Sequence, residues 1–306
     1  MKKIAAVLAA VAVAATLSSC AKRATSTGPV VGVTLLTKAH PFYQQMEKAM
    51  KEEAAARNMT LRIQSAETQL GTQNSQVDGF ITQKVAAIVI CPVDSASIVG
   101  AIRRANDAKI PVFTADIAAK GGDVVCHIAS DNVAGGRLAG EHMVKLLKGK
   151  GEIVVIDYPT VTSVQDRTKG FMEAVGKSQI KVVGRPNGDA DRAKSMAAMD
   201  NMLQAHPGIK GVFAINDNTA LGVLASLSHA KRTDIVVVGY DGDPEAREAI
   251  LAGSPLKADA VQYPREIGKT TIEMVSRHLS GEKVPANKPV EVGIIDKESL
   301  EAEKKQ

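Results

Sequence analysis

Short runs of Val, Ile and Ala recur along this chain, and stretches with helical spacing lie between most of them. The expected strands are residues 30–36, 61–64, 87–91, 110–114, 124–128, 153–156, 182–183, 211–215, 235–239 and 258–261. Between the first two runs, Phe42, Met46, Ala49 and Met50 repeat at the spacing of one helix face. Near-continuous apolar strands are typical of sheets covered on both faces, so the pattern predicts an α/β protein with largely parallel sheets.

The expected strands divide into two similar halves. Residues 87–91 are an apolar run followed by Pro-Val-Asp, and residues 211–215 are a similar apolar run followed by Asn216 and Asp217. The run that ends at Asp116 is echoed by the run that ends at Asp241, and both echoes have the same offset of 125 positions. A chain of 306 residues is also long enough for two domains. We therefore expect two similarly wound lobes.

Polar and aromatic side chains follow several of these strands. In open parallel sheets, ligands lie beyond the carboxyl ends of the strands, and two facing lobes would share one cleft there. The side chains at these positions are His40, Phe42, Tyr43, Asp116, Arg167, Asn216, Asp241 and Gln262. Carboxylates, amides and a guanidinium engage hydroxyls, and aromatic rings cover the C–H side of a sugar. The set predicts a polyhydroxylated, neutral ligand.

Most of these residues also have an ordinary structural interpretation. Asp116 and Asp241 could be helix N-caps, since Asp is common there. Arg167 could be a solvated surface charge, and Asn216 could be a turn residue. No single residue decides between the two interpretations.

Aromatic residues make up only 3% of the chain, so a pair of them in a polar loop stands out. Phe42 and Tyr43 open a segment with an apolar stripe. Adjacent helix positions face different directions, so only one of the two is expected to pack into the core.

The N-terminus has the pattern of an export signal. Lys2 and Lys3 precede an apolar run, residues 4–16, which is shorter than the roughly 20 residues that a membrane span needs. The run leads into Leu-Ser-Ser-Cys, which resembles a bacterial lipobox. We expect residues 1–19 to be a lipoprotein signal peptide, Cys20 to be lipidated, and residues 20–29 to be a tether. A plain secretory signal with an incidental Cys is the alternative.

Export into an oxidising compartment leaves Cys91 and Cys126 as an even pair. Both lie in apolar runs that are expected to be strands. Two buried free thiols are therefore favoured over a disulfide.

Motifs of several other protein classes are missing. The sequence contains no His-Glu-x-x-His and no Gly-x-Ser-x-Gly, and its Gly-Lys-Ser at 176–178 follows a helical run, as a helix C-terminus does. His40, His127 and His142 lack the spacing of metal ligands. The net charge of +5 is spread without a basic block, which argues against nucleic acid as a partner. We expect no metal and no cofactor.

Seven segments together resemble the type I periplasmic sugar-binding proteins of ABC transporters, the family of the ribose-binding protein. They are residues 40–43, 110–116, 127–132, 167–171, 212–217, 238–242 and 261–264, in the family's order. The resemblance implies two Rossmann-like lobes with parallel sheets, joined by a hinge of three crossings near 130–131, 262–263 and 291–292. The N-terminal lobe would hold residues 30–130 and 263–291, and the C-terminal lobe residues 131–262 and 292–306.

The resemblance also implies that the eight side chains named above contact the ligand. Three positions depart from the ribose-type pattern, with His40 in place of Asn, Ile117 in place of Arg, and Ala190 in place of an aromatic residue. Loss of a guanidinium removes a bidentate clamp on hydroxyls, so D-ribose itself is not the expected ligand. A wider pocket suits a hexose, a cyclic polyol or a substituted sugar, and Tyr158 is a candidate for the lost ring face.

The hypothesis is a non-catalytic, monomeric, extracytoplasmic receptor that is held at a membrane only by lipidated Cys20. It would capture a sugar or polyol and deliver it to an ABC transporter permease. One alternative is a sensor that docks on a chemoreceptor or histidine kinase. Another is a secreted hydrolase with Asp116 and Asp241 as paired acids. Transcription regulators of similar fold carry an N-terminal helix-turn-helix, where this chain has a signal peptide.

Overall fold

The computed structural model describes residues 28–304. The predicted signal peptide, Cys20 and most of the predicted tether lie outside the described residues. Within residues 28–304, no helix is both long enough and apolar enough to cross a membrane.

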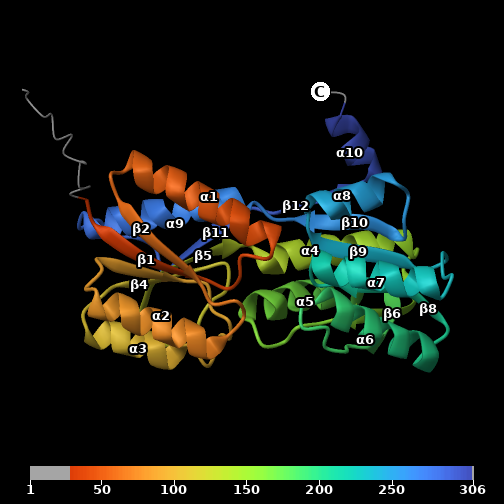
Figure 1. The fold of residues 1–306 in the computed structure, drawn as a ribbon. Coiled ribbons are helices and arrows are strands. Elements are labelled where there is room, and N and C mark those ends of the chain that lie inside the picture. Colours follow the sequence, from red (N-terminus) through yellow and green to blue (C-terminus); the bar gives the residue numbers. More distant parts are fainter. Residues whose placement is uncertain (1–27, 305–306) are drawn as a thin grey trace, which may run out of the picture.

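The first half of the fold is a six-stranded sheet in the order β11-β5-β4-β3-β1-β2. Its strands are β1 (Val30–Leu35), β2 (Thr60–Ser65), β3 (Ala87–Ile90), β4 (Val112–Ala115), β5 (Val124–Ser130) and β11 (Asn287–Val290). Helices α1 (Pro41–Ala56) and α9 (Pro264–Leu279) cover one face, and α2 (Leu70–Thr82) and α3 (Val99–Asp107) cover the other (Figure 1). All its strand pairs are parallel.

The second half is a six-stranded sheet in the order β12-β10-β9-β8-β6-β7. Its strands are β6 (Lys150–Ile156), β7 (Gln179–Gly184), β8 (Ile209–Ala214), β9 (Val236–Asp241), β10 (Leu256–Val261) and β12 (Gly293–Asp296). Helices α4 (Asn132–Leu146) and α5 (Thr162–Val175) cover one face. The other face is covered by α6 (Arg192–Ala205), α7 (Asp217–His229), α8 (Pro244–Leu251) and α10 (Lys297–Glu303).

The two sheets repeat one strand order, which confirms the prediction of two similarly wound halves. The first pair of similar runs forms β3 and β8, which occupy the same position in the two sheets, and the second pair forms β4 and β9, which occupy the neighbouring position. The chain passes between the sheets after β5, after β10 and again between β11 and β12, and these four strands form one edge of each sheet. The two halves lie side by side (Figure 1). The carboxyl ends of both sets of parallel strands therefore meet between the lobes.

The strands β11 and β12 were not predicted from the sequence. Each has only four residues, and Lys288 and Pro289 interrupt any apolar pattern in β11. Both lie at sheet edges, where Pro is tolerated because one side of the strand needs no partner. Strand β12 runs antiparallel to β10, unlike the other pairs of its sheet.

Glycines let the backbones of α4 and α5 pack directly against each other. A Cβ atom on Gly136 would lie 1.9 Å from the carbonyl oxygen of Arg167, and one on Gly170 would lie 2.0 Å from that of Val133. Only glycine permits this approach. It sets Arg167, on α5, directly beside Asn132 at the start of α4.

Cys91 and Cys126 are free and buried. The favoured interpretation of two buried thiols is confirmed, and the disulfide alternative is wrong. Burial raises the pKa of the Cys126 thiol to about 11, which keeps it protonated and unreactive at neutral pH.

Candidate functional site

A cavity of about 760 Å³ lies between the two lobes, and residues of both line it. Its size is within the range of small-molecule sites. All eight side chains that sequence analysis singled out line this cavity: His40, Phe42, Tyr43, Asp116, Arg167, Asn216, Asp241 and Gln262.

Asp116 follows β4 and is held by Tyr43. The Tyr43 hydroxyl donates to Asp116 Oδ2 at 2.5 Å, whereas the buried Oδ1 has no hydrogen-bond partner among the described residues. Burial raises the pKa of Asp116 to about 6, although Arg167 and the Tyr43 hydrogen bond oppose the change. The N-cap interpretation of Asp116 is wrong, because β5 and not a helix follows it. Its φ of 66° is a strained conformation that aims the carboxyl at the cavity.

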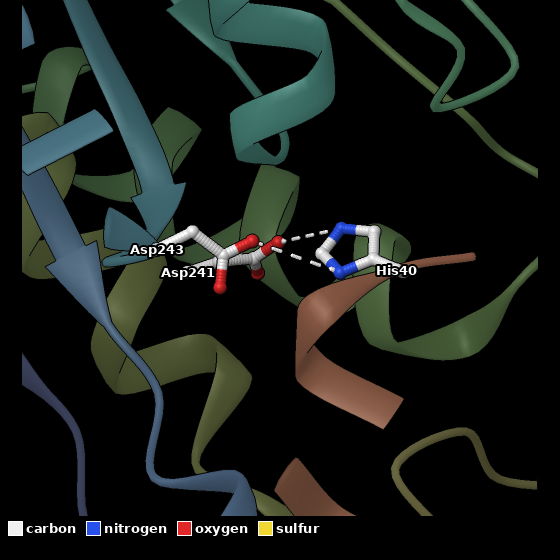
Figure 2. A group of neighbouring side chains, drawn as sticks. All are labelled: His40, Asp241 and Asp243. Carbon is white, nitrogen blue, oxygen red and sulfur yellow. Dashed lines mark ion pairs between the residues drawn. The ribbon is translucent and has the colours of Figure 1, made fainter. Parts of the chain in front are cut away.

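His40 reaches from the first lobe to two carboxylates of the second (Figure 2). Its Nδ1 accepts from the backbone N–H of Phe42 and so caps α1, which leaves Nε2 to carry the ring proton. Nε2 lies 3.4 Å from Asp241 Oδ2, and Nδ1 lies 3.7 Å from Asp243 Oδ2. Burial lowers the pKa of His40, but the hydrogen bond to Asp241 and the charges of Asp241, Asp243 and Asp116 outweigh burial and raise it.

One nitrogen of His40 and one carboxylate oxygen each of Asp241 and Asp243 lie within 4.8 Å of one another. Because Nδ1 caps α1 and Nε2 carries the ring proton towards Asp241, we interpret this group as a histidine held between two acids. Two hundred positions separate the histidine from the acids, so ligand spacing along the chain gave no sign of this group.

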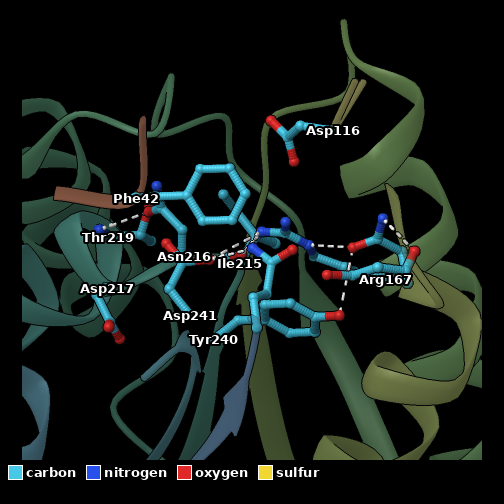
Figure 3. Close-up of polar contacts among 12 residues, drawn as sticks. Phe42, Asp116, Arg167, Ile215, Asn216, Asp217, Thr219, Tyr240 and Asp241 are labelled. Atoms are coloured by element: carbon cyan, nitrogen blue, oxygen red, sulfur yellow. Dashed lines mark hydrogen bonds and ion pairs between the residues drawn. The ribbon is translucent and has the colours of Figure 1, made fainter. Parts of the chain in front are cut away.

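Arg167 is fixed by contacts on every side (Figure 3). Its Nε donates to Asn132 Oδ1 at 2.9 Å, and its Nη1 donates to the carbonyl oxygen of Ile215 at 2.8 Å. Nη1 also lies 3.6 Å from Asp241 Oδ1, and the guanidinium lies 4.0 Å above the ring of Tyr240. The side chain is buried, so its interpretation as a solvated surface charge is wrong. A preorganised guanidinium of this kind is suited to clamp hydroxyls.

Asp241 and Gln262 form a bonded pair at the ends of β9 and β10. Gln262 Nε2 donates to Asp241 Oδ1 at 2.7 Å, and the buried Gln262 Oε1 has no partner among the described residues. Asp241 is not an N-cap, since Asp243 precedes α8. Asn216 is the N-cap of α7, where its Oδ1 accepts from Thr219 N at 2.9 Å, so it caps a helix and also lines the cavity.

Phe42 and Tyr43 are both buried, each 4% exposed, and both belong to the core of the first lobe. The prediction that only one of them would pack inside is wrong. Their rings meet edge to face at 5.2 Å. Both rings also line the cavity that residues of the second lobe complete, and the spacing of a single helix face gives no information about this cover.

Ile117, Tyr158 and Ala190 also line the cavity. Ile117 belongs to the first lobe but packs into the apolar cluster of the second, with Val161 and Val164. Tyr158 and Ala190 border the same cluster. Ile117, Tyr158 and Ala190 thus form an apolar patch of the cavity wall, beside the charged residues Asp189, Asp191, Arg192 and Lys194, which line the same cavity.

The lobes contact each other directly through Thr162, which sequence analysis did not single out. Its backbone N–H donates to Ser95 Oγ at 3.1 Å. Its hydroxyl oxygen accepts from Ala118 N at 3.0 Å and lies 3.2 Å from Ala118 O, to which it can donate. No local motif marks such a contact, because it exists only where the lobes have closed.

A cavity that two like lobes close over, lined from both sides by polar groups with unpaired acceptors, defines a hinged binding protein for a small polar molecule. Residues 31–283 match the family described as "Periplasmic binding protein domain". The chain belongs to this periplasmic binding protein family.

Known relatives agree along nearly the whole chain. The ribose import binding protein RbsB of Salmonella typhimurium is 34% identical over 97% of this chain and 99% of its own. A solute-binding protein of an ABC transporter from Mycobacterium smegmatis, solved with bound glycerol, has a TM-score of 0.85 and 34% identity over 90% of this chain and 96% of its own. A Bacillus halodurans solute-binding protein with bound myo-inositol has a TM-score of 0.84 and 29% identity over 92% of this chain and 99% of its own.

Proposed function

We propose that this protein is the substrate-binding component of an ABC importer and captures a monosaccharide or polyol between its lobes. The observation that carries the proposal is the pair of buried acceptors, Asp116 Oδ1 and Gln262 Oε1, that lack partners beside the cavity. A buried acceptor without a partner is costly, and ligand hydroxyls would satisfy both. Relatives named for ribose import and solved with glycerol or myo-inositol support this ligand class.

In this proposal the lobes divide the ligand contacts. Asp116 and Gln262 accept from hydroxyls, Arg167 and Asn216 donate to them, and Phe42 covers a C–H face of the ring. His40 Nε2, Tyr43 and Asp241 complete the ring of contacts, as partners of one another and of the ligand.

We further propose that the ligand is larger than a pentose. Ile117 and Ala190 replace polar and aromatic groups with small or apolar ones, and Ile117 is directed into the second lobe. The apolar wall leaves room for a hexose, a cyclic polyol or a substituted sugar. Tyr158, beside this wall, would face the ligand ring.

The proposed action is binding followed by a change of shape, without catalysis. An open form admits the ligand, the ligand and Thr162 hold the lobes together, and a permease recognises the closed form. The protein acts as a monomer. A sensor that docks on a chemoreceptor or histidine kinase would use the same closure.

We also propose an extracytoplasmic location with lipidated Cys20 as the membrane anchor, and lobes of residues 30–130 with 263–291 and 131–262 with 292–306. Metabolic labelling of the full chain with tritiated palmitate tests the anchor. Label in the wild type that is absent from Cys20→Ala is expected, and label in neither overturns the anchor.

The test of function is a thermal-shift screen of the chain from residue 21 onward against pentoses, hexoses, inositols and small polyols. A ligand that binds only the native state at 100 times its Kd adds about 2.7 kcal/mol of stability, so a hit raises the Tm. Arg167→Ala and Asp241→Ala should weaken binding about 30-fold or more, because truncating a buried charged hydrogen-bond partner costs about 2–5 kcal/mol. The exposed Arg103→Ala and Asp107→Ala are matched controls.

Two results would refute the proposal. The first is that no compound of these classes shifts the Tm of the wild type. The second is that the best ligand binds Arg167→Ala and Asp241→Ala as tightly as the controls. A product that appears when glycosides are incubated with the wild type would instead favour the hydrolase alternative.

A further inference from the structure

Two aspartates meet beneath the candidate site, in the core of the second lobe. Asp217 opens α7 and Asp259 lies in the middle of β10, and their exposed fractions are 1% and 0%. A Cβ atom on Gly239 would lie 3.0 Å from Asp259 Oδ1 and 3.4 Å from Asp217 Oδ1. Both oxygens thus border the same small space above β9, which only a glycine leaves free.

These carboxyls have few other partners. Asp217 Oδ2 accepts from the backbone N–H of Asp243 at 2.7 Å. Asp217 Oδ1 and both oxygens of Asp259 receive no well-aligned hydrogen bond from an N–H or hydroxyl group of the described residues. Two fully buried carboxylates without a cation cannot both be ionised, whereas one shared proton satisfies one oxygen of each.

We propose that Asp217 and Asp259 share one proton and act as a positioning pair, which holds the turn from Asp241 to Asp243 in the geometry that binds the ligand. The inference rests on the proposed function, since Asp241 is one of the proposed ligand contacts. Neither member of the pair lines the cavity, so the pair acts through the turn and not on the ligand itself.

The turn is fixed from two sides. Asp217 holds the N–H of Asp243, and Arg247 Nε donates to the carbonyl oxygen of Gly242 at 2.9 Å. Asp241 and Gly242 lie directly before Asp243, with φ values of 125° and 79° that are strained for Asp and natural for glycine. A strained turn keeps its shape only while its hydrogen bonds persist. A second charge would make the two carboxylates repel each other and draw Asp217 away from the Asp243 N–H. The backbone of the turn would then shift, although Gln262 still contacts the Asp241 side chain.

The electrostatic surroundings support a retained proton. Burial raises the pKa of both carboxyls, that of Asp259 to about 8, and the charges of Asp241 and Asp243 act in the same direction. Cations beside the turn face other acids: Arg167 and His40 face Asp241, and His40 also faces Asp243. Charged groups on the elements packed around the pair and the turn include His40 of α1, Arg167 of α5, Asp241 and Asp243 after β9, Arg192 of α6 with Glu245 of α8, Arg247 of α8 with Glu303 of α10, and His142 of α4 with Asp296 of β12.

Asp259→Asn is the informative variant. The amide can donate permanently to the Asp217 carboxylate, so it keeps the bond and removes the titration. Ligand affinity is measured by calorimetry with D-ribose, D-allose and myo-inositol as probes. Between pH 7.5 and 9.5 the wild type should lose affinity about tenfold or more, as the shared proton leaves. Asp259→Asn should change less than about threefold over the same range.

Asp217→Ala removes the acceptor for Asp243 and should weaken binding about tenfold at pH 7.5. Asp217→Asn keeps an acceptor oxygen and should restore most of that loss. Asp107→Asn, an exposed acid of the first lobe, controls for the change of charge and should match the wild type at every pH. Where Asp217→Ala does not fold, the comparison of the wild type with Asp259→Asn decides alone.

Melting temperatures test the shared proton without any ligand. A carboxyl with a raised pKa in the folded state stabilises it at low pH, and this stability is lost as the pH rises towards the folded pKa. The Tm of the wild type should therefore fall relative to that of Asp259→Asn between pH 5 and 8. If no probe binds the wild type, the proposed function is in error, and the melting comparison still decides whether the proton is shared.

Three outcomes would overturn the pair. Parallel affinity and melting profiles for the wild type and Asp259→Asn would show that no proton titrates there. Unchanged affinity of a folded Asp217→Ala would show that the turn does not need the contact. A wild-type affinity that chelators abolish and Ca²⁺ restores would place a cation, and not a proton, between the two acids.

Discussion

Substituting Phe for Tyr43 removes one hydroxyl and leaves the shape of the first lobe unchanged. That hydroxyl donates to Asp116 Oδ2 at 2.5 Å, inside a site from which the lobes exclude water. Asp116 would then lose its only hydrogen-bond donor among the described side chains, and its ionised form would be less stable. The substitution should therefore act on ligand affinity through the protonation of Asp116.

The size of the effect follows from this one contact. A hydrogen bond to a charged group contributes about 1.5–3 kcal/mol, and one pKa unit corresponds to about 1.36 kcal/mol. Burial already raises the pKa of Asp116 to about 6, so Tyr43→Phe should bring it to roughly 7–8. At pH 7 about nine-tenths of wild-type molecules would carry the carboxylate, against about a tenth to a half of the variant.

Calorimetric titration with the best ligand from the screen, at half-unit steps from pH 5 to 9, measures the effect. An accepting carboxylate binds hydroxyls above its pKa and loses them as the pH falls through it. The wild type should lose affinity near pH 6 and Tyr43→Phe near pH 7–8, so the loss of affinity that the variant shows should be about 2–10-fold larger at pH 7 than at pH 9.

Tyr263→Phe provides the matched control, because this exposed tyrosine lies outside the cavity. Its affinity profile should follow that of the wild type. A profile of Tyr43→Phe with the wild-type midpoint would refute the reasoning, and so would a loss of affinity that is the same at pH 7 and pH 9.

Two further predictions concern closure and packing. Thr162→Val keeps the shape of Thr162 but removes its hydroxyl contacts with Ala118. Ligand affinity in calorimetry should therefore fall about tenfold, and the unliganded protein should be more open in small-angle X-ray scattering. Thr82→Val, on an exposed helix face, should change neither quantity. Equal affinities for the two variants would contradict a role of Thr162 in closure. Gly136→Ala sets a methyl group 1.9 Å from a carbonyl oxygen and should lower the free energy of unfolding, measured in urea, by about 1–3 kcal/mol. Gly71→Ala, whose new methyl group would have no atom within 4 Å, should be neutral or stabilising by up to about 1 kcal/mol. If Gly136→Ala is as stable as Gly71→Ala, the close packing of α4 on α5 is disproved.

The fold was largely predictable because its signals are local and repeated. Apolar runs mark all strands that are covered on both faces, and the offset of 125 positions marked the two halves. Strands β11 and β12 escaped, because an edge strand of four residues needs no apolar run. Their pairing depends on where the rest of the chain has placed the sheet edges, which is not a property of the segment itself.

The candidate site was predictable where residues follow a strand, and hidden where contacts depend on closure. A general rule for parallel sheets brought together Asp116, Asn216 and Asp241. Thr162 forms hydrogen bonds with the other lobe, and Asp259 of β10 lies beside Asp217 of α7 on the face of the sheet above β9. Neither contact leaves a spacing or a motif in the sequence, since each joins residues whose distance only the tertiary structure sets.

The return of the chain to the first sheet has a consequence for synthesis on the ribosome. Helix α9 supplies Ile267, Ile272 and Met274 to the apolar core of the first lobe, and β11 completes its sheet. A nascent chain that has grown only to β10 holds five strands of each sheet, and on one face of the first sheet α1 still lacks its neighbour α9. The half of the molecule that is translated first thus completes its core only when residues 264–290 have emerged, and only β12 and α10 of the second half follow them.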